Sequence, residues 1–456
     1  MRLWCATLLL LLASFFTTSG WAQTDSLDNK LSISLNFLTH GEVCSGGLPK
    51  SEDGTVSQED RSAFLQGRTR LFVDYERRGI QAHATIQNNA VWGTSDNMAL
   101  KLYEGWVKLT AENGLFAQIG RVALSYDDER IIGPNDFATA ANSHDVLRAG
   151  YEGHGHKFHV ILAYNQNGND VYADTYYDDG AQYYKTMHTA WYHYDVPKVP
   201  LGVSLLFMNI GQQAGQYVDG NGPIEEKVAS ESNPPRTEYQ QVYGGYFTFH
   251  PKHLTLEGSY YRQTGQMVDS KKQASPIKAW MASAKATISP TDQYGFELGY
   301  DYLSGDDYVP LRYGGRKGLP RHEVNKGFAP LYGSRTTFYG IMDYFYESAY
   351  LNGFTPGLQD ATIGVFGNPI DKLKCSANYH YLAVATDLSN LNRTLGHSIE
   401  LEAKYRFSPY ISLSAGYTYM IGTETMECLK QQNCSKHARW GWFSLVISPS
   451  ILTTKW

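Results

Sequence analysis

Basic side chains recur at alternate positions of several segments, and their chemistry is the easiest in this sequence to assign. Arg68 and Arg70 come first, within QGRTRLFVDYERRGIQAHATIQ at residues 66–87. A guanidinium group binds a carboxylate or phosphate through two parallel hydrogen bonds, and rings of Arg or Lys in a pore favour anions. Arg121 joins this set if Gly120 forms a β-bulge, because strict alternation turns Arg121 to the other face. The remaining basic residues expected on the same inner face are Lys108, Arg148, Lys374, Lys404 and Arg406.

Acidic side chains fall on the same face as these basic ones. Because the signs are mixed, the arginines and lysines could equally pair with carboxylates and only hold the wall rigid. The sequence leaves both interpretations open, an anion-binding lumen and a structural ladder of ion pairs. The acidic residues concerned are Asp74, Glu104, Glu257, Glu297, Asp301, Glu400 and Glu402.

Catalytic and metal chemistry find little support in the sequence. His154, His156 and His159 straddle a predicted turn, so we do not expect them to form a metal site. The acidic loop at 305–307 has no EF-hand pattern. There is no GxSxG motif, and no Ser/His/Asp set can be assembled. We therefore expect no catalytic residue, no metal and no cofactor, and a protein that is not an enzyme.

The cysteines predict an exported protein with one disulfide. Cys428 and Cys434 lie close together in one predicted hairpin loop, and an oxidising compartment permits their pairing. Cys44 falls in a predicted early loop and Cys375 on the apolar face of a predicted strand. We expect both of these residues to be free thiols.

Short alternating segments position the charged residues. In residues 66–87 the first arm places Leu71 and Val73 opposite Arg68 and Arg70, and the second arm follows a turn at 77–79 with the same period of two. Comparable segments recur to residue 448. The predicted strands lie around 31–37, 66–76, 80–87, 102–109, 115–126, 144–152, 156–165, 186–194, 201–211, 237–249, 254–264, 277–288, 294–304, 359–366, 372–385, 396–407, 410–421 and 438–448.

The connections between these strands alternate in length. About eight short turns interleave with about nine long loops, including one at about 304–358. This regularity, with outward faces almost free of charge, predicts an all-β fold. We expect a transmembrane antiparallel β-barrel of about 18 strands, with short periplasmic turns, long extracellular loops and both termini on the short-turn side. Pro449 leaves the end of the last strand uncertain.

Composition and the N-terminus agree with this fold. Arg2, the apolar run at 8–16 and the small residues Gly20 and Ala22 predict a signal peptide at 1–22, followed by one barrel domain at 23–456. No segment approaches the ~18 apolar residues of a spanning helix. Aromatic residues make up 14% of the chain and include 34 tyrosines, which is typical of aromatic girdles at two membrane interfaces. The net charge of −6 argues against nucleic acid as a partner.

Several segments, taken in order, resemble the alginate export family of outer-membrane barrels, particularly its porin-like members from Bacteroidetes. They are LYEGWVKL, GLFAQIGRVALSYDDERIIG, HDVLRAGYE, GYDYLSGDD, FAPLYGSRTTFYGIMDYF and GLQD. The resemblance implies eighteen strands and an arginine-rich constriction that passes an anionic uronate polymer. The residues that match this lining are Arg68, Arg70, Arg121, Arg130 and Arg148.

These observations predict a channel in the bacterial outer membrane for passive diffusion or export of hydrophilic, anionic solutes, including an anionic polysaccharide such as alginate. The expected partners are outer-membrane lipid, lipopolysaccharide and the solutes themselves. Two alternatives stay open. One is a structural or adhesive barrel whose lumen is plugged by the loop at about 304–358, and the other is a barrel enzyme with a nucleophile on its wall.

Overall fold

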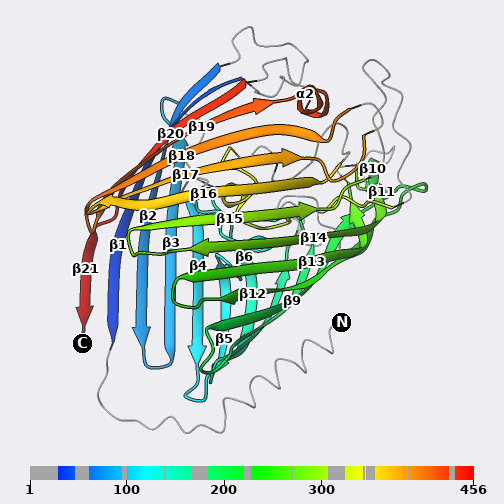
Figure 1. Cartoon of the computed structure of the whole chain (residues 1–456). Coiled ribbons are helices and arrows are strands. Elements are labelled where there is room, and N and C mark those ends of the chain that lie inside the picture. Colours follow the sequence, from blue (N-terminus) through cyan, green and yellow to red (C-terminus); the bar gives the residue numbers. More distant parts are fainter. Residues whose placement is uncertain are drawn as a thin grey trace.

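The described part of the chain forms one closed antiparallel barrel of 18 strands in a computed structural model (Figure 1). The structure describes residues 29–46, 61–94, 100–137, 140–166, 182–219, 227–269, 271–306, 324–342, 345, 355–388, 391–430 and 437–456. The predicted signal peptide lies outside them. The wall strands are β1 (Lys30–Ser45), β2 (Arg61–Arg77), β3 (Ile80–Val91), β4 (Lys101–Thr110), β5 (Leu115–Val122), β6 (His144–Gly153), β7 (His156–Tyr164), β8 (Thr186–Asp195), β9 (Leu201–Ala214), β12 (Arg236–Phe249), β13 (Leu254–Val268), β14 (Ala274–Ile288), β15 (Tyr294–Leu303), β16 (Leu358–Ile370), β17 (Leu373–Ala383), β18 (Thr394–Ser408), β19 (Ile411–Gly422), β20 (His437–Ile447) and β21 (Ser450–Lys455).

The last strand closes the barrel against the first. β20 and β21 both pair with β1, and they are two parts of one strand interrupted at Pro449. Proline has no N–H to donate to the ladder, but the Pro449 carbonyl still accepts a 3.1 Å hydrogen bond from the Leu35 N–H. Asn29 and Trp456 exchange backbone hydrogen bonds of 3.0 and 3.1 Å at the end of this seam. The sequence did not determine where this strand ends. In the structure the strand continues beyond Pro449 to Lys455.

Side chains alternate between an apolar outer face and a polar inner face. In β18, Ile399 and Leu401 are 46% and 48% exposed, whereas Glu400 between them is 5% exposed. The same alternation places Leu298 and Tyr300 of β15 outward. Exposed apolar side chains on a closed sheet face lipid, so the prediction of a transmembrane barrel is confirmed.

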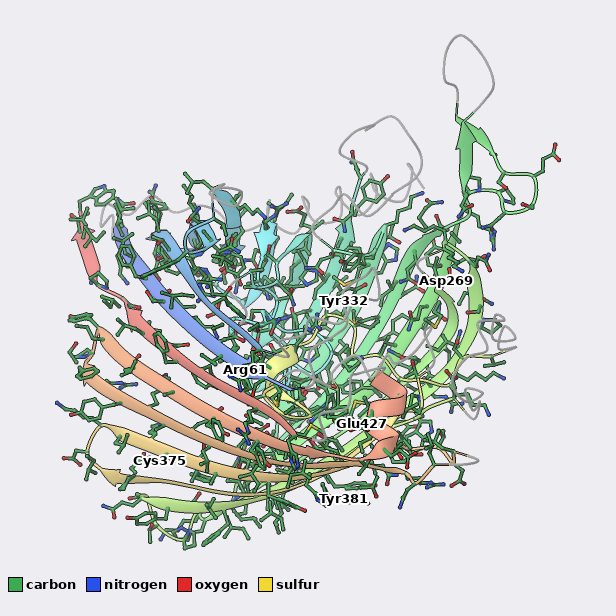
Figure 2. All side chains as sticks on the ribbon, turned by 90° about the horizontal axis from the view of Figure 1, so that it is seen from above. Arg61, Asp269, Tyr332, Cys375, Tyr381 and Glu427 are labelled. Atoms are coloured by element: carbon green, nitrogen blue, oxygen red, sulfur yellow. The ribbon has the colours of Figure 1, made fainter. Side chains whose placement is uncertain are left out.

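The two ends of the barrel differ in their connections. Asn29 and Trp456, the first and last described residues, lie at the end with the short turns (Figure 1). This end is periplasmic in outer-membrane barrels. The other end carries the long loops, one of which contains the ribbon β10 (Tyr217–Asp219) and β11 (Lys227–Ala229) that projects beyond the rim (Figure 2). The short turns are residues 78–79, 111–114, 154–155, 196–200, 250–253, 289–293, 371–372 and 409–410.

Described segments of two long connections lie inside the barrel. One connection joins β5 to β6 at residues 123–143, and the other joins β15 to β16 at residues 304–357, in which the described segment 324–342 includes the short 3₁₀ helix η1 (Arg335–Thr337). Ile132 and Tyr332 bridge the two connections in parallel. Tyr332 lies inside the ring of strands (Figure 2) and is 7% exposed. The hydrophobic core of the molecule therefore includes these two loops and the inner wall that they contact.

Two sequence predictions about cysteines are resolved by the fold. Cys44 and Cys375 are free thiols, as predicted. The prediction that Cys44 lies in a loop is wrong, because β1 continues to Ser45 and Cys44 pairs with Ser62 of β2. Cys428 belongs to helix α2 (Glu424–Lys430), and its predicted partner Cys434 lies outside the described residues. The described helices include none long and apolar enough to cross a membrane.

Candidate functional site

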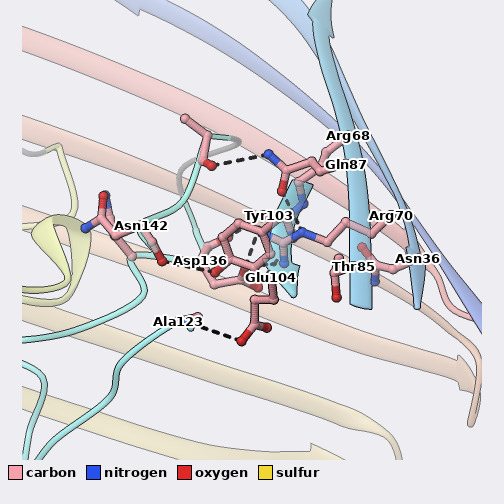
Figure 3. Close-up of polar contacts among 12 residues, drawn as sticks. Asn36, Arg68, Arg70, Thr85, Gln87, Tyr103, Glu104, Ala123, Asp136 and Asn142 are labelled. Carbon is pink, nitrogen blue, oxygen red and sulfur yellow. Dashed lines mark hydrogen bonds and ion pairs between the residues drawn. The ribbon is translucent and has the colours of Figure 1, made fainter. Parts of the chain in front are cut away.

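Two arginines of β2 converge on one carboxylate of an inward loop. Arg68 donates to both carboxylate oxygens of Asp136, at 3.2 and 3.3 Å, and to the Asp136 carbonyl oxygen at 2.9 Å. Arg70 Nη1 donates to Asp136 Oδ1 at 2.6 Å (Figure 3). Both arginines are 5% exposed, whereas the Asp136 side chain is 54% exposed. The pair therefore holds a carboxylate at the surface of the remaining lumen.

Neighbouring side chains fix the orientation of Arg70. Its Nε donates to Gln87 Oε1 at 2.7 Å, and its guanidinium lies 4.0 Å from the centre of the Tyr103 ring. Tyr103 faces inward because the pairing of β3 with β4 shifts by one residue there. Strict alternation from the inward Glu104 would turn Tyr103 to the outer face with Gly105 and Val107, and the bulge turns it inward instead. Among the described residues, Arg70 Nη2 is buried without a hydrogen-bond partner.

The loop at residues 123–143 spans the lumen from β2 to the opposite wall. Asp127 accepts hydrogen bonds from Trp191 Nε1 of β8 at 3.0 Å and from the Tyr261 hydroxyl of β13 at 3.2 Å. Burial raises the pKa of Asp127, and hydrogen bonds from Ser204, Trp191 and Tyr261 offset part of that rise. The loop that presents Asp136 is thus anchored on both sides of the pore.

Arg130 ties the loop to the far wall and to the second inward loop. Its Nε lies 3.1 Å from Asp128, its Nη1 donates to the Tyr339 hydroxyl at 2.9 Å, and its Nη2 contacts Ser283 and Asp301 at 3.1 and 3.2 Å. Burial lowers the pKa of Arg130, but Asp301, Tyr339 and Asp128 together raise it well above the ordinary value. Each of its side-chain nitrogens has a partner. The anion-binding role of Arg130 stays a prediction, and in this structure carboxylates and hydroxyls occupy its guanidinium.

Lys108 and Arg148 lie on the inner face of the wall, and each is engaged with neighbouring side chains. Lys108 Nζ lies 3.8 Å from Glu152 and 4.3 Å from the centre of the Phe116 ring. Arg148 Nη1 donates to the Tyr126 hydroxyl at 3.3 Å, which links β6 to the inward loop. Both cations therefore contribute to the packing of the wall.

The predicted lumenal position of Arg121 is wrong. Gly120 has a φ of +130°, but the pairing of β5 with β6 continues without a register shift. Arg121 consequently shares the outer face with Ile119, which is 64% exposed. There it forms a bidentate ion pair with Asp145 at 2.7 and 2.8 Å.

Two predicted acidic residues anchor the inward loops. Glu104 accepts a 3.0 Å hydrogen bond from the Ala123 N–H at the start of the first loop (Figure 3). Glu400 accepts a 2.9 Å hydrogen bond from the Ile341 N–H in the second loop. A carboxylate that accepts backbone N–H bonds in a confined lumen stabilises the position of the chain that donates them.

The other predicted residues lie apart from the arginine pair. Asp74 Oδ1 is 2.6 Å from His83 Nδ1 on the adjacent strand. Glu402 is half-buried on the inner face of β18, and Lys404 and Arg406 are exposed on that face toward the short-turn end. The structure therefore brings together Arg68 and Arg70 and distributes the other charges over the wall.

Sequence reasoning missed the two groups that complete this site. Asp136 lies in a connection without periodicity, so nothing local indicates that its carboxylate returns to β2. Tyr103 is hidden by a bulge that reverses its face. A signal for the loop did exist in the run 127–130, DDER, whose charges inside a barrel require partners.

Comparisons with known proteins agree with this architecture. A sequence model described as alginate export matches residues 56–398. A comparison with curated protein sequences finds no match. Among solved structures, a BenF-like porin from Pseudomonas fluorescens Pf-5 has a TM-score of 0.57 at 10% identity, covering 92% of this chain and 99% of that one. OccK11 (OpdR) of Pseudomonas aeruginosa has a TM-score of 0.55 at 10% identity, with 93% and 96% coverage. OccAB1 of Acinetobacter baumannii has a TM-score of 0.56 at 10% identity, with 92% and 97% coverage.

Proposed function

Because the chain belongs to the alginate export family and forms an outer-membrane channel, we propose that it passes small hydrophilic solutes bearing a carboxylate, with Arg68 and Arg70 as their binding pair. Transport is passive, driven by the solute gradient. One observation carries the proposal: two buried guanidinium groups share a single half-exposed carboxylate.

Asp136 occupies the place that a solute carboxylate would take. Two cations against one anion leave a local excess of one positive charge, and Arg70 Nη2 has no partner among the described residues. An incoming carboxylate can bind this excess charge or replace Asp136 outright. Tyr103 and Gln87 hold Arg70 in position in either case, so the guanidinium does not need to reorganise.

The inward loops favour small solutes over a polymer. The loop at 123–143 is fixed to β2 through Asp136 and to β8 through Asp127, and Arg130 ties it to β14 and β15. A polysaccharide needs a continuous wide path, whereas a small acid can pass beside a fixed loop. Export of an anionic polysaccharide such as alginate is the related alternative suggested by the family description.

Planar-bilayer recordings test the proposal. In a salt gradient, the reversal potential of the parent channel should show anion preference, and a dicarboxylate should reduce the chloride current. Arg68→Ala with Arg70→Ala should shift the reversal potential toward cations. Arg68→Lys with Arg70→Lys is the matched variant: it should keep the anion preference but weaken the dicarboxylate block, because Lys lacks the bidentate fork. Cation preference in the parent, unchanged by the alanine variant, would contradict the proposal.

A structural or adhesive barrel is the second candidate, and the loop packing favours it. The two inward loops join through Ile132 and Tyr332, and Ser334 donates to Glu129 Oε2 at 2.7 Å. If these loops close the lumen, the purified barrel gives no conductance steps in the bilayer. Liposome swelling with small neutral and acidic solutes then distinguishes a sealed barrel from a narrow channel.

A further inference from the structure

The lipid-facing side of the barrel carries cations that form no ion pair with a carboxylate of the described residues. Arg262 of β13 and Lys278 of β14 are exposed, and each lies on the outward parity of its strand. No ion pair joins either residue to another described residue. In the described strands, the outward carboxylate Asp145 is already paired with Arg121. The outer wall therefore has an excess of positive charge, although the whole chain has a net charge of −6.

Arg262 and Lys278 are neighbours on this face. In the β13–β14 ladder, Arg262 lies opposite Trp280 and Lys278 lies opposite Thr264. The two cations are thus diagonal neighbours, with Cα atoms about 7–8 Å apart, which long side chains easily bridge. β13 and β14 run side by side in the wall (Figure 1). One multiply charged anion can contact both cations.

Aromatic rings surround this pair. Tyr243 of β12 lies opposite Arg262 on the side away from Trp280. Trp280 stacks on Tyr302 with ring centres 4.7 Å apart, and the ring centres of Tyr260 and Trp280 are 6.1 Å apart. Such outward aromatic clusters mark the level of lipid headgroups in outer-membrane barrels. The two cations therefore lie in a headgroup layer.

The strand geometry places this layer on the extracellular side. β13 begins at Leu254 beside a short periplasmic turn, and Arg262 follows eight residues later. At about 3.3 Å per residue and a tilt of about 45°, that separation gives a height of about 19 Å within an apolar band about 25 Å tall. An outward charge is costly at the midplane but tolerated near the interface.

We propose that Arg262 and Lys278 bind the phosphate groups of the glycolipid that forms the outer leaflet, lipopolysaccharide. The guanidinium supplies a bidentate contact with phosphate and the ammonium a point charge. Tyr243, Tyr260 and Trp280 flank the headgroup with apolar and hydrogen-bonding surface. This site lies on the outer wall and is independent of the lumenal function proposed above.

Native mass spectrometry of the full barrel in detergent, titrated with bis-phosphorylated lipid A, tests the site. Arg262→Ala with Lys278→Ala should weaken lipid A binding by about 10-fold or more, since two charge-assisted contacts are lost. Arg262→Lys should retain most of the binding. Arg77→Ala is the matched control, because Arg77 has the same outward parity on β2 but lies at the short-turn end. Heat-modifiable migration on gels verifies that each variant is folded.

Three outcomes would overturn the proposal. The double variant could bind lipid A as tightly as the parent, or the parent could bind dephosphorylated lipid A equally well. Displacement of lipid A by inorganic phosphate would assign the cations to a free anion instead of a lipid headgroup. The glycolipid site is supported if inorganic phosphate does not displace lipid A from the parent and the double variant loses lipid A binding.

Discussion

Asp136→Asn is the substitution that most directly tests how the inward loop sets the charge of the pore. It removes the negative charge shared by Arg68 and Arg70 while keeping the size of the side chain. A unit charge about 5 Å from a passing ion in water changes the energy of that ion by about 0.8 kcal/mol, or about fourfold in local concentration. Anions gain and cations lose, so the anion-to-cation permeability ratio should rise by about 10-fold in dilute salt. Screening reduces this change once the Debye length falls to about 10 Å.

The assay is the reversal potential across a planar bilayer at two salt concentrations. Asp136→Glu is the control, because it keeps the charge and should leave the selectivity close to that of the parent. The charge-assisted hydrogen bonds of Asp136 contribute about 1 kcal/mol to loop attachment, since the side chain is 54% exposed. Asp136→Asn should also lower the thermal stability, because it leaves the buried guanidinium groups of Arg68 and Arg70 without this carboxylate. An unchanged permeability ratio in a folded Asp136→Asn channel would refute the assignment of this carboxylate to the pore surface.

Three further predictions concern residues whose placement differs from simple alternation or that anchor the loop. Arg130→Met should destabilise the barrel by about 3–5 kcal/mol because it leaves Asp301 buried without its cation, and denaturant unfolding in detergent measures the loss. Arg121→Ala should leave ion selectivity unchanged, because Arg121 faces outward and pairs with Asp145. A shift in the reversal potential of this variant would contradict the outward placement. Burial raises the pKa of Asp127, so loop attachment should strengthen as the pH falls from about 7 toward about 4. Open-channel noise should decrease over that range, and Asp127→Asn should abolish the dependence.

The wall of this barrel is predictable from sequence because its two faces meet different solvents. Each strand that faces lipid outside and water inside must alternate with a period of two, as Ile399, Glu400 and Leu401 do. That constraint fixes the fold class, the strand number and the side chains of β2. It fails where the backbone departs from regular pairing, as at Tyr103, whose bulge changes no residue type and leaves no compositional trace.

Only the arginines of the candidate site could be predicted from the sequence, for a related reason. Arg68 and Arg70 follow from alternation, but their partner Asp136 lies 66 residues beyond Arg70 in a loop without periodic constraint. Gly120 shows the opposite failure. The glycine suggested a bulge that would turn Arg121 inward, yet the ladder accommodates its φ of +130° without a register shift. Local sequence cannot distinguish a kinked regular strand from a true bulge.

The mixed charge of the lumen divides into two classes once partners are considered. Arg130 and Lys108 each contact a carboxylate that belongs to the packed wall or loops, so their charges are neutralised within the structure. Arg68 and Arg70 share a single carboxylate that is itself half-exposed, so the group carries one excess positive charge at the surface of the lumen. An electrostatic argument from residue counts treats all of these arginines alike. Selectivity in such a barrel should follow instead from which cations have partners exposed to the lumen, and this makes the arginine pair of β2 the determinant to test.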